Sequence, residues 1–557
     1  MTATTFDAGR HVSPHLVDTH DLTSLGYPQE LHRKLGPFAS FAAGFSFVSI
    51  LTTVFQLFAF GYSFGGPAFV WTWPIVFVGQ LCVALVFAEL AAEYPLAGCT
   101  FQWSRRLGGA LVGWFAGWFM LIGYIVSVGA IAIALQSVLP EVWSGFQLFG
   151  GESSLSSTSG ATNAIILGTI LIAIATVISA IGVQVMAKIN AIGITCEIVG
   201  VVALIILLFV HTKRGPSVVT DTGGTAGSGS YLWPLLASSL MAAYVMYGFD
   251  SAAELSEETR DPRRTTPPAI VRALVVSGDR WGAAAHGGAD VGARPAQRPD
   301  GHGGDVLHRH LDPGQRAGQG APRRRGHRRD QRLPGDPELS VAGHVLDGAR
   351  GRAAGVKVAQ RVGRTTGTPI VTGVAVSALA AAVLLVNLGQ SQVFTAVTSV
   401  AVVVVYLAYL FVTIPMLLRK LRDRTLPRGQ GLRSGEPAAA RGHFSLGRAG
   451  LPVTLLAVLF GLFMTANVAW PRAAVYDPAG GHWYLQYFSL LFLAGALLLG
   501  GLAYRVTVTS PAARSTSTSR DLSRGRTWCG SPRTSRSACS STSPPGWPVS
   551  AGPEGFG

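Results

Sequence analysis

The sequence predicts an all-α protein that crosses a membrane many times, and three observations lead to this fold class. The chain has 557 residues, of which 49% are hydrophobic and only 13% are charged, whereas soluble domains usually carry about 25% charged residues. Its mean hydropathy is +0.38. Its apolar residues are gathered into runs of roughly 20 residues, the length that crosses a bilayer as a helix. These features exclude a disordered chain, a disulfide scaffold and an ordinary cytosolic enzyme.

Ten apolar runs are expected to span the bilayer. They follow a polar segment, residues 1–35, that lacks the apolar core of a cleaved signal peptide. The expected spans are 38–62, 68–92, 111–139, 163–183, 190–211, 233–256, 369–388, 393–418, 452–470 and 484–504. An eleventh apolar run begins near Pro267 and stops at Gly278, so it is too short to cross alone.

The charges of the connecting segments predict the orientation. If the N-terminus is cytoplasmic, the cytoplasmic side carries 18 Lys and Arg residues and the outer side 3, leaving out residues 278–364 and 510–557. Positive residues are enriched on the cytoplasmic side of membrane proteins. We therefore expect a multi-pass protein of the plasma membrane with its N-terminus and its 93–110 loop in the cytoplasm.

Two stretches differ in composition from the rest. Residues 278–364 contain 16 Lys+Arg against 9 Asp+Glu, and 6 of the chain's 13 histidines, but no Ile, Phe, Met or Tyr. The tail from residue 510 is rich in Ser, Arg, Pro and Gly. One interpretation is a disordered basic loop and tail. The interpretation we prefer is a GC-rich gene read in a shifted frame, which produces this mixture of residues.

A membrane-anchored nucleic-acid binder is a further alternative, because such a protein would use the basic loop. The Arg clusters in residues 278–364 lack the interleaved aromatic residues of a nucleic-acid platform. We therefore expect no nucleic-acid partner.

The most informative segment is YVMYGFDSAAELSEETRDPRRTTPPAI, residues 244–270. It places Asp250 and Glu254 near the end of an apolar span, where carboxylates are costly unless they face protein or water. A helix break at Tyr247–Ser251, with freed backbone groups lining a cavity, would explain them. The alternative is that three carboxylates simply end the span in water, namely Glu254, Glu257 and Glu258.

The first span has a related pattern. Its Gly44-Phe45-Ser46 resembles Gly248-Phe249-Asp250, and hydroxyl side chains that can satisfy an unwound backbone are clustered around it, at Ser46, Ser49, Thr52 and Thr53. These hydroxyls could equally be packing residues. Paired interruptions in two halves of a membrane protein indicate the central site of a transporter.

Three segments carry a family resemblance: ELAAEYPLAGCTFQWSRRLGG (89–109), GFDSAAELSEETRDPRR (248–264) and RTTGTP (364–369). They resemble bacterial permeases of the amino acid–polyamine–organocation (APC) superfamily, in the amino acid/choline transporter branch. The resemblance covers roughly residues 25–277 and 364–508.

The resemblance implies twelve helices, with spans 1–5 and 6–10 forming an inverted repeat and two extra C-terminal helices. Spans 1 and 6 would be unwound where substrate binds, with the substrate carboxylate near Ser49–Thr53 and its amino group near Tyr247–Phe249. The implied substrate-binding residues are Ser46, Ser49, Ile50, Thr52, Thr53, Tyr247, Gly248, Phe249 and Asp250. Glu254 would take part in coupling transport to an ion or in gating access to the substrate site. Thr53 stands where a glycine is usual in the family, which would narrow the site.

The implied span numbering divides the chain into five segments. They are a cytoplasmic segment (1–35), spans 1–6 with the start of span 7 (36–277), the anomalous segment (278–364), spans 9–12 (365–508) and the tail (509–557). Most of span 7 and all of span 8 are absent as readable helices, so these two spans are disrupted. We expect the printed chain to insert as ten spans.

The expected function is secondary active transport of an amino acid or related amine by alternating access. A proton or sodium gradient, or exchange, would drive it. The alternative is a non-functional permease product damaged by the frame shift. No catalytic arrangement, metal spacing or cofactor motif stands out, so we expect no enzyme activity, no metal and no cofactor.

Overall fold

The computed structural model describes ten stretches of the chain, and every structural statement below refers to them. They are residues 35–48, 50–155, 157–181, 183–211, 215–225, 229–291, 370–385, 393–425, 443–477 and 480–506. The expectations for the tail, and for the anomalous segment after Val291, lie outside the described residues.

The first half of the chain forms helices that cover its first five expected spans. Their bounds are α2 (Pro37–Val48), α3 (Ile50–Gly65), η1 (Pro67–Trp71), α4 (Thr72–Glu93), α5 (Cys99–Gly108), α6 (Ala110–Ala134), α7 (Leu139–Val142), α8 (Thr158–Ile181) and α9 (Val183–Val210). The second half continues with α10 (Leu232–Val245), α11 (Ser251–Glu254), α12 (Pro262–Val291), α15 (Ile370–Leu385), α16 (Val393–Thr425), α17 (Gly450–Ala469), α18 (Ala473–Tyr476), α19 (Trp483–Gln486) and α20 (Phe488–Tyr504).

The all-α multispan fold is confirmed. Each of the ten expected spans coincides with helix, and the described residues contain no strand, only one isolated bridge between Leu35 and Thr259. Six helical segments in the described residues are long and apolar enough to cross a membrane, and three further apolar helices are shorter. The inverted repeat stays a prediction.

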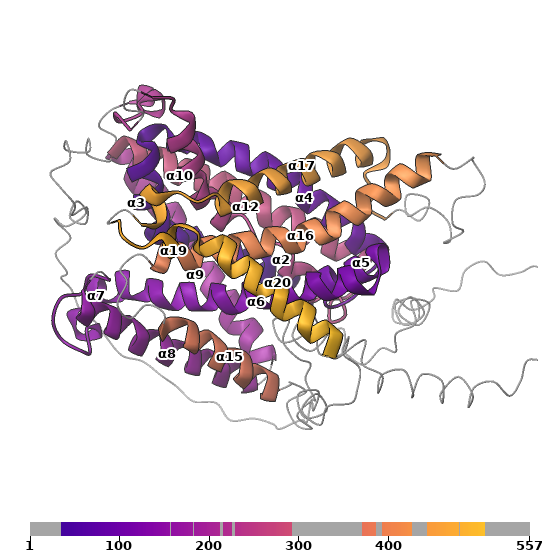
Figure 1. The fold of residues 1–557 in the computed structure, drawn as a ribbon, viewed down its shortest axis with the longest axis horizontal. Helices are drawn as coiled ribbons and strands as arrows, with labels where there is room; N and C mark the ends of the chain where they lie inside the picture. The colour runs from indigo at the N-terminus through magenta and orange to yellow at the C-terminus, as the bar shows by residue number, and fades with distance from the viewer. Residues whose placement is uncertain are drawn as a thin grey trace, which may run out of the picture. The chain divides into compact units, whose positions relative to one another are not determined.

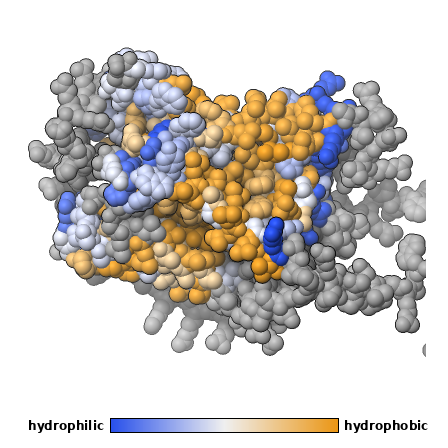
Figure 2. Space-filling model, viewed as in Figure 1, coloured by the Kyte–Doolittle hydropathy of each residue, from blue (hydrophilic) through white to orange (hydrophobic). Residues whose placement is uncertain are grey.

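The helices pack around a shared apolar core and leave apolar side chains outside it. α4 contacts α10, α12 and α17, while α8 and α15 lie side by side next to α6 (Figure 1). A broad apolar surface is flanked by hydrophilic residues gathered towards two opposite ends (Figure 2). Large side chains exposed on α8 and α17 include Ile174, Val177, Leu456, Leu459 and Phe463. Such a surface suits lipid, because a soluble protein rarely exposes so large an apolar patch.

The 93–110 segment differs from the simple loop that the sequence predicts, because it contains the helix α5. Gly98 opens the helix in a left-handed conformation (φ 67°), which glycine adopts without steric cost. The six residues Cys99–Ser104 are buried, whereas Arg105 and Arg106 are exposed. α5 is therefore an amphipathic helix that inserts its first two turns against α6 and α16.

α12 also differs from expectation. The apolar run ends at Gly278, but the helix continues to Val291. Its first half belongs to the core, where Ile270 and Leu274 are fully buried and the indole Nε1 of Trp73 donates a 2.6 Å hydrogen bond to the Gly278 carbonyl. A helix can persist beyond its apolar run because backbone hydrogen bonding does not require apolar side chains.

The position of α5 tests the membrane orientation. Ser104 would be a poor reporter, because its side chain is fully buried and would resist labelling from either side. Arg105→Cys places the thiol at an exposed position on the same helix. We expect this thiol to resist a membrane-impermeant maleimide in intact cells and to react once the membrane is permeabilised, as read by a mass-tag gel shift. Rapid labelling in intact cells would place the loop outside.

Candidate functional site

The predicted helix break is present in the sixth expected span. α10 ends at Val245, residues 246–250 are not helical, and α11 begins at Ser251. The predicted break reached Ser251, but this residue is already helical. Gly248 has φ 93°, a conformation that residues with a side chain rarely adopt. The glycine lets the chain turn between two helical segments inside the core.

The end of α2 lies against this break. A Cβ atom built on Gly248 would lie 1.8 Å from Cδ1 of Phe47, and one built on Gly44 would lie 3.2 Å from the carbonyl oxygen of Phe249. The two similar tripeptides, Gly44-Phe45-Ser46 and Gly248-Phe249-Asp250, are therefore neighbours in space. Gly248 is needed because the ring of Phe47 occupies the space where a side chain would start, and at Gly44 a Cβ would be in tight contact with its neighbours.

Tyr409 of α16 holds the break through its hydroxyl group. The hydroxyl accepts a hydrogen bond from the Gly248 N–H at 2.9 Å and donates one to Oδ1 of Asp250 at 2.6 Å. The other carboxylate oxygen of Asp250 lies 3.5 Å from Oγ1 of Thr100, which donates to it. Asp250 is fully buried, so these contacts supply the partners that a buried carboxylate requires.

Glu254 is held by the N-terminal end of α5. Its carboxylate accepts hydrogen bonds from the Gly98 N–H at 2.8 Å and from the Cys99 thiol at 3.2 Å, and Glu257 accepts one from the Ala97 N–H at 3.0 Å. A helix N-terminus favours negative charge. Glu254 and Glu258 are each only 3% exposed, so the alternative in which they end the span in water is wrong.

Aromatic side chains enclose the break. The ring of Phe47 lies 5.9 Å from that of Tyr247 and 5.5 Å from that of Tyr124, and Phe87 lies 5.7 Å from Phe249, all between ring centroids. The Tyr247 hydroxyl is 2.8 Å from the hydroxyl of Ser127. The polar groups of the break therefore lie inside an apolar, aromatic shell that excludes bulk water.

The predicted residues of the first span are only partly described. Ser46 is half-buried and donates a 2.6 Å hydrogen bond to Oδ1 of Asn190 on α9. The remaining predicted residues cannot be placed at the site: Ser49 lies outside the described residues, and so do the side chains of Ile50, Thr52 and Thr53.

Sequence reasoning missed Tyr409, Thr100 and Cys99 as neighbours of the break. Thr100 and Cys99 lie within the segment 89–109 that carried the family resemblance, so a signal existed for them. Tyr409 lies inside an apolar span, where a tyrosine does not stand out from a packing residue.

Three groups around the break have the chemistry of metal ligands. One ligand atom from each of Cys99, Asp250 and Glu254 lies within 4.8 Å of the others, and all three residues are buried. The Asp250 and Glu254 carboxylates accept hydrogen bonds from protein groups, and the thiol donates one. The fold therefore accounts for this cluster without an ion.

Comparison with known proteins finds similarity in the first half of the chain. A family model described as amino acid permease matches residues 35–278. Amino-acid permease BAT1 of Arabidopsis thaliana is 29% identical over 268 residues, which are 46% of this chain and 51% of that protein. Branched-chain amino acid permease BcaP of Lactococcus lactis is 28% identical over 222 residues, 38% of this chain and 46% of that protein.

The chain spans about half the length of the curated relatives it matches. The family match ends at residue 278, the residue at which the composition changes, and the resemblance of residues 364–508 stays a prediction. Residues 35–278 are therefore similar to amino acid permeases, in agreement with the family resemblance of the sequence.

Proposed function

We propose that this protein moves an amino acid or a related amine across the plasma membrane by alternating access, with its N-terminus in the cytoplasm. The observation that carries the proposal is the buried helix break at residues 246–250, flanked by α2. Irregular backbone at membrane depth is tolerated where it is buried in protein or lines a cavity, and broken helices of this kind form the central sites of transporters.

The chemistry of the break suits the ammonium group of a substrate. The carbonyl end of α10 carries partial negative charge, and the Tyr247 carbonyl accepts no hydrogen bond from the described residues. Asp250 adds a carboxylate three residues further along the chain, bound to the Tyr409 hydroxyl. The substrate carboxylate would meet the backbone of Ser49–Thr53, which follows α2 in the sequence. Phe47 covers Gly248 in this structure, so its ring has to move when substrate reaches the backbone.

The substrate class is supported by the surroundings of the break and by the relatives. The shell of Phe47, Tyr124, Tyr247 and Phe249 is apolar, which suits an apolar side chain. One relative is named as a branched-chain amino acid permease. Leucine, isoleucine and valine are therefore the first substrates to test, with a proton or sodium ion, held near Glu254, as the coupling ion.

The second candidate is a permease product whose transport is impaired because spans 7 and 8 are disrupted. It is favoured by the family match, which stops where the composition changes. We propose that residues 278–364 stand in the sequence where spans 7 and 8 would be. The wall of the substrate cavity that span 8 would supply is then missing, so the printed chain transports weakly. Correcting the reading frame at both edges of this segment should restore twelve spans.

Uptake assays in proteoliposomes test both candidates. We expect the frame-corrected chain to take up radiolabelled branched-chain amino acids and the printed chain to take up little. A well-folded corrected chain that neither binds nor transports any amino acid would refute the proposed function. Equal uptake by both chains would show that residues 278–364 form a genuine loop.

A further inference from the structure

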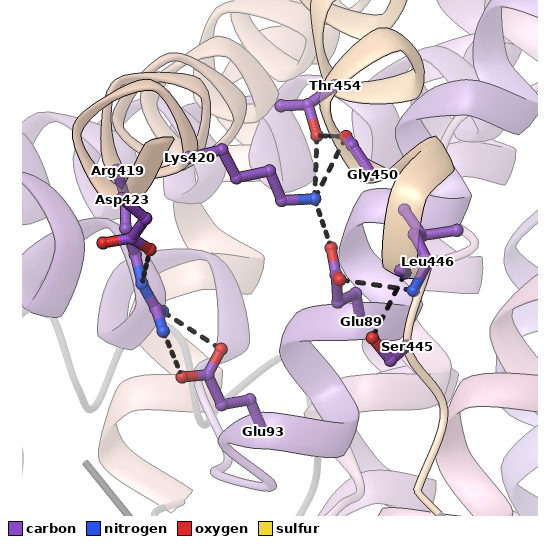
Figure 3. A network of polar contacts seen from close by, with 10 residues as sticks. Glu89, Glu93, Arg419, Lys420, Asp423, Ser445, Leu446, Gly450 and Thr454 are labelled. Atoms are coloured by element: carbon purple, nitrogen blue, oxygen red, sulfur yellow. Dashed lines mark hydrogen bonds and ion pairs between the residues drawn. The ribbon is translucent and has the colours of Figure 1, made fainter. Parts of the chain in front are cut away.

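Two ion pairs join the end of α4 to the end of α16, away from the break. Glu93 takes both guanidinium prongs of Arg419, at 2.6 and 3.0 Å, and Glu89 pairs with the ammonium group of Lys420 (Figure 3). Glu89 and Glu93 are four residues apart, so they lie on one face of α4. Arg419 and Lys420 are consecutive on α16, so they point in directions about 100° apart and reach different carboxylates.

The Glu89–Lys420 pair also contacts the start of α17 and the residues just before it. The Lys420 ammonium donates to the Gly450 carbonyl and to the Thr454 hydroxyl, each at 3.1 Å, and Glu89 accepts from the Leu446 N–H at 3.3 Å (Figure 3). The side chains of Lys420 and Glu89 are only 15% and 14% exposed. Three segments distant in the sequence therefore meet at one partly buried charge cluster.

This cluster is connected to the break by two routes. Along α16, Tyr409 binds Asp250 ten residues before Arg419, a distance of about 15 Å on a helix. Through α5, Arg419 donates to the Tyr94 hydroxyl at 3.4 Å, Trp103 donates to the Tyr94 carbonyl at 2.9 Å, and the opposite end of α5 holds Glu254.

The same cluster lies at the cytoplasmic ends of the helices, where an alternating-access transporter would close its path to the cytoplasm. The ends of α4 and α16 and the start of α17 are on the side to which the positive charges assign the cytoplasm. Separating these helices would break several charge-assisted hydrogen bonds at once, and part-buried charges that lose a partner are costly. The cluster therefore favours the arrangement in which the helix ends stay together.

We propose that Glu89, Glu93, Arg419 and Lys420 form the cytoplasmic gate lock of the transporter, closed in this structure and released when the break binds or loses substrate. The proposal rests on the proposed function for the cycle in which the lock works. In physical terms, the ion pairs of these four side chains determine how often the contact between α4, α5 and α16 opens.

A thiol introduced at a buried position of α5 can measure this opening without any transport. Ser104 is fully buried on α5, which packs against α6 and α16, so Ser104→Cys should react slowly with a maleimide. The experiment uses the full chain in detergent and follows modification of residue 104 by mass spectrometry. Arg105→Cys, at an exposed position, gives the rate of an open site.

In the Ser104→Cys background, we expect Lys420→Met and Glu89→Gln each to speed labelling about tenfold or more, because each removes one partner of a part-buried pair. Arg419→Lys should give an intermediate rate, because lysine keeps the charge but loses the two-pronged contact. The double exchange Glu89→Lys with Lys420→Glu should restore slow labelling in part. Arg424→Gln, which removes an exposed charge near the same end of α16, should leave the rate unchanged.

The outcomes separate the lock from the proposed function. Equal labelling rates in Lys420→Met, Arg419→Lys, Arg424→Gln and the Ser104→Cys parent would overturn the lock, even if the protein transports amino acids. Labelling of that parent as fast as the exposed Arg105→Cys thiol would overturn it as well. Graded rates in monodisperse protein would support the lock even if no amino acid is transported. If Lys420→Met or Glu89→Gln is not monodisperse, it is left out of the comparison. The labelling rate of Arg419→Lys relative to the Ser104→Cys parent then decides whether the lock exists.

Discussion

Gly248→Leu is expected to destabilise the folded protein strongly, rather than only to weaken substrate binding. The backbone at Gly248 has φ 93°, and the new Cβ would lie 1.8 Å from the ring of Phe47. Backbone strain alone costs about 1–3 kcal/mol for a residue with a side chain, and the clash adds to it. Fluorescence-detected size-exclusion chromatography after heating would show loss of the monodisperse peak at a much lower temperature.

Two further variants separate the clash from the strain. Gly248→Ala combined with Phe47→Ala removes the clashing ring but keeps the backbone strain, so it should be more stable than Gly248→Ala alone. Gly495→Leu on α20 is the matched control, because nothing lies within 4 Å of a Cβ at that helical position. If Gly248→Leu and Gly495→Leu melt at the same temperature, the close approach of Phe47 is not a feature of the folded protein.

Glu254→Gln is expected to lower the initial rate of uptake by about tenfold or more in the frame-corrected chain, since losing a group that supports a functional site typically costs this much. Glutamine keeps an acceptor for the Gly98 N–H but removes the carboxyl group, and with it the ability to carry a negative charge, from the N-terminus of α5. It also disturbs the contact with the Cys99 thiol. The rate would be measured across a range of external pH, because the variant lacks the carboxyl group that can carry a proton.

Asp261→Asn is the appropriate control for that experiment. Glu258 is unsuitable because it is buried, whereas Asp261 is exposed and its carboxylate forms a 3.8 Å pair with the exposed Arg264. Its φ of 44° is one that asparagine tolerates. Uptake and pH dependence that change equally in both variants would remove Glu254 from any role in coupling or gating.

The sequence was sufficient for the helices of the ten expected spans and for the location of the break. Long apolar runs leave few structures that satisfy their backbone in lipid, and Asp250 and Glu254 interrupt such a run. α5 was missed because its alternation of buried and exposed residues covers only ten residues, a length that also fits a polar loop.

The partners of the site could not be predicted in the same way. Tyr409 and Asp250 are 159 residues apart, and Glu89 and Lys420 are 331 apart. Pairing over such separations depends on how the helices pack, and a single sequence shows no periodicity that encodes it. The charges of Glu89 and Lys420 mark helix ends equally well whether or not they meet.

The contacts that anchor Glu254 and Glu257 are made by main-chain N–H groups of Ala97 and Gly98. Alanine scanning would therefore reveal these contacts only through Glu254 and Glu257, because trimming a side chain on the donor side leaves the main-chain N–H intact. Only proline lacks that donor, so Ala97→Pro is the substitution that exposes its contribution. Ala97 is itself only 3% exposed, so the packing around residue 97 limits the size of its side chain, while the hydrogen bond to Glu257 depends on the main chain alone.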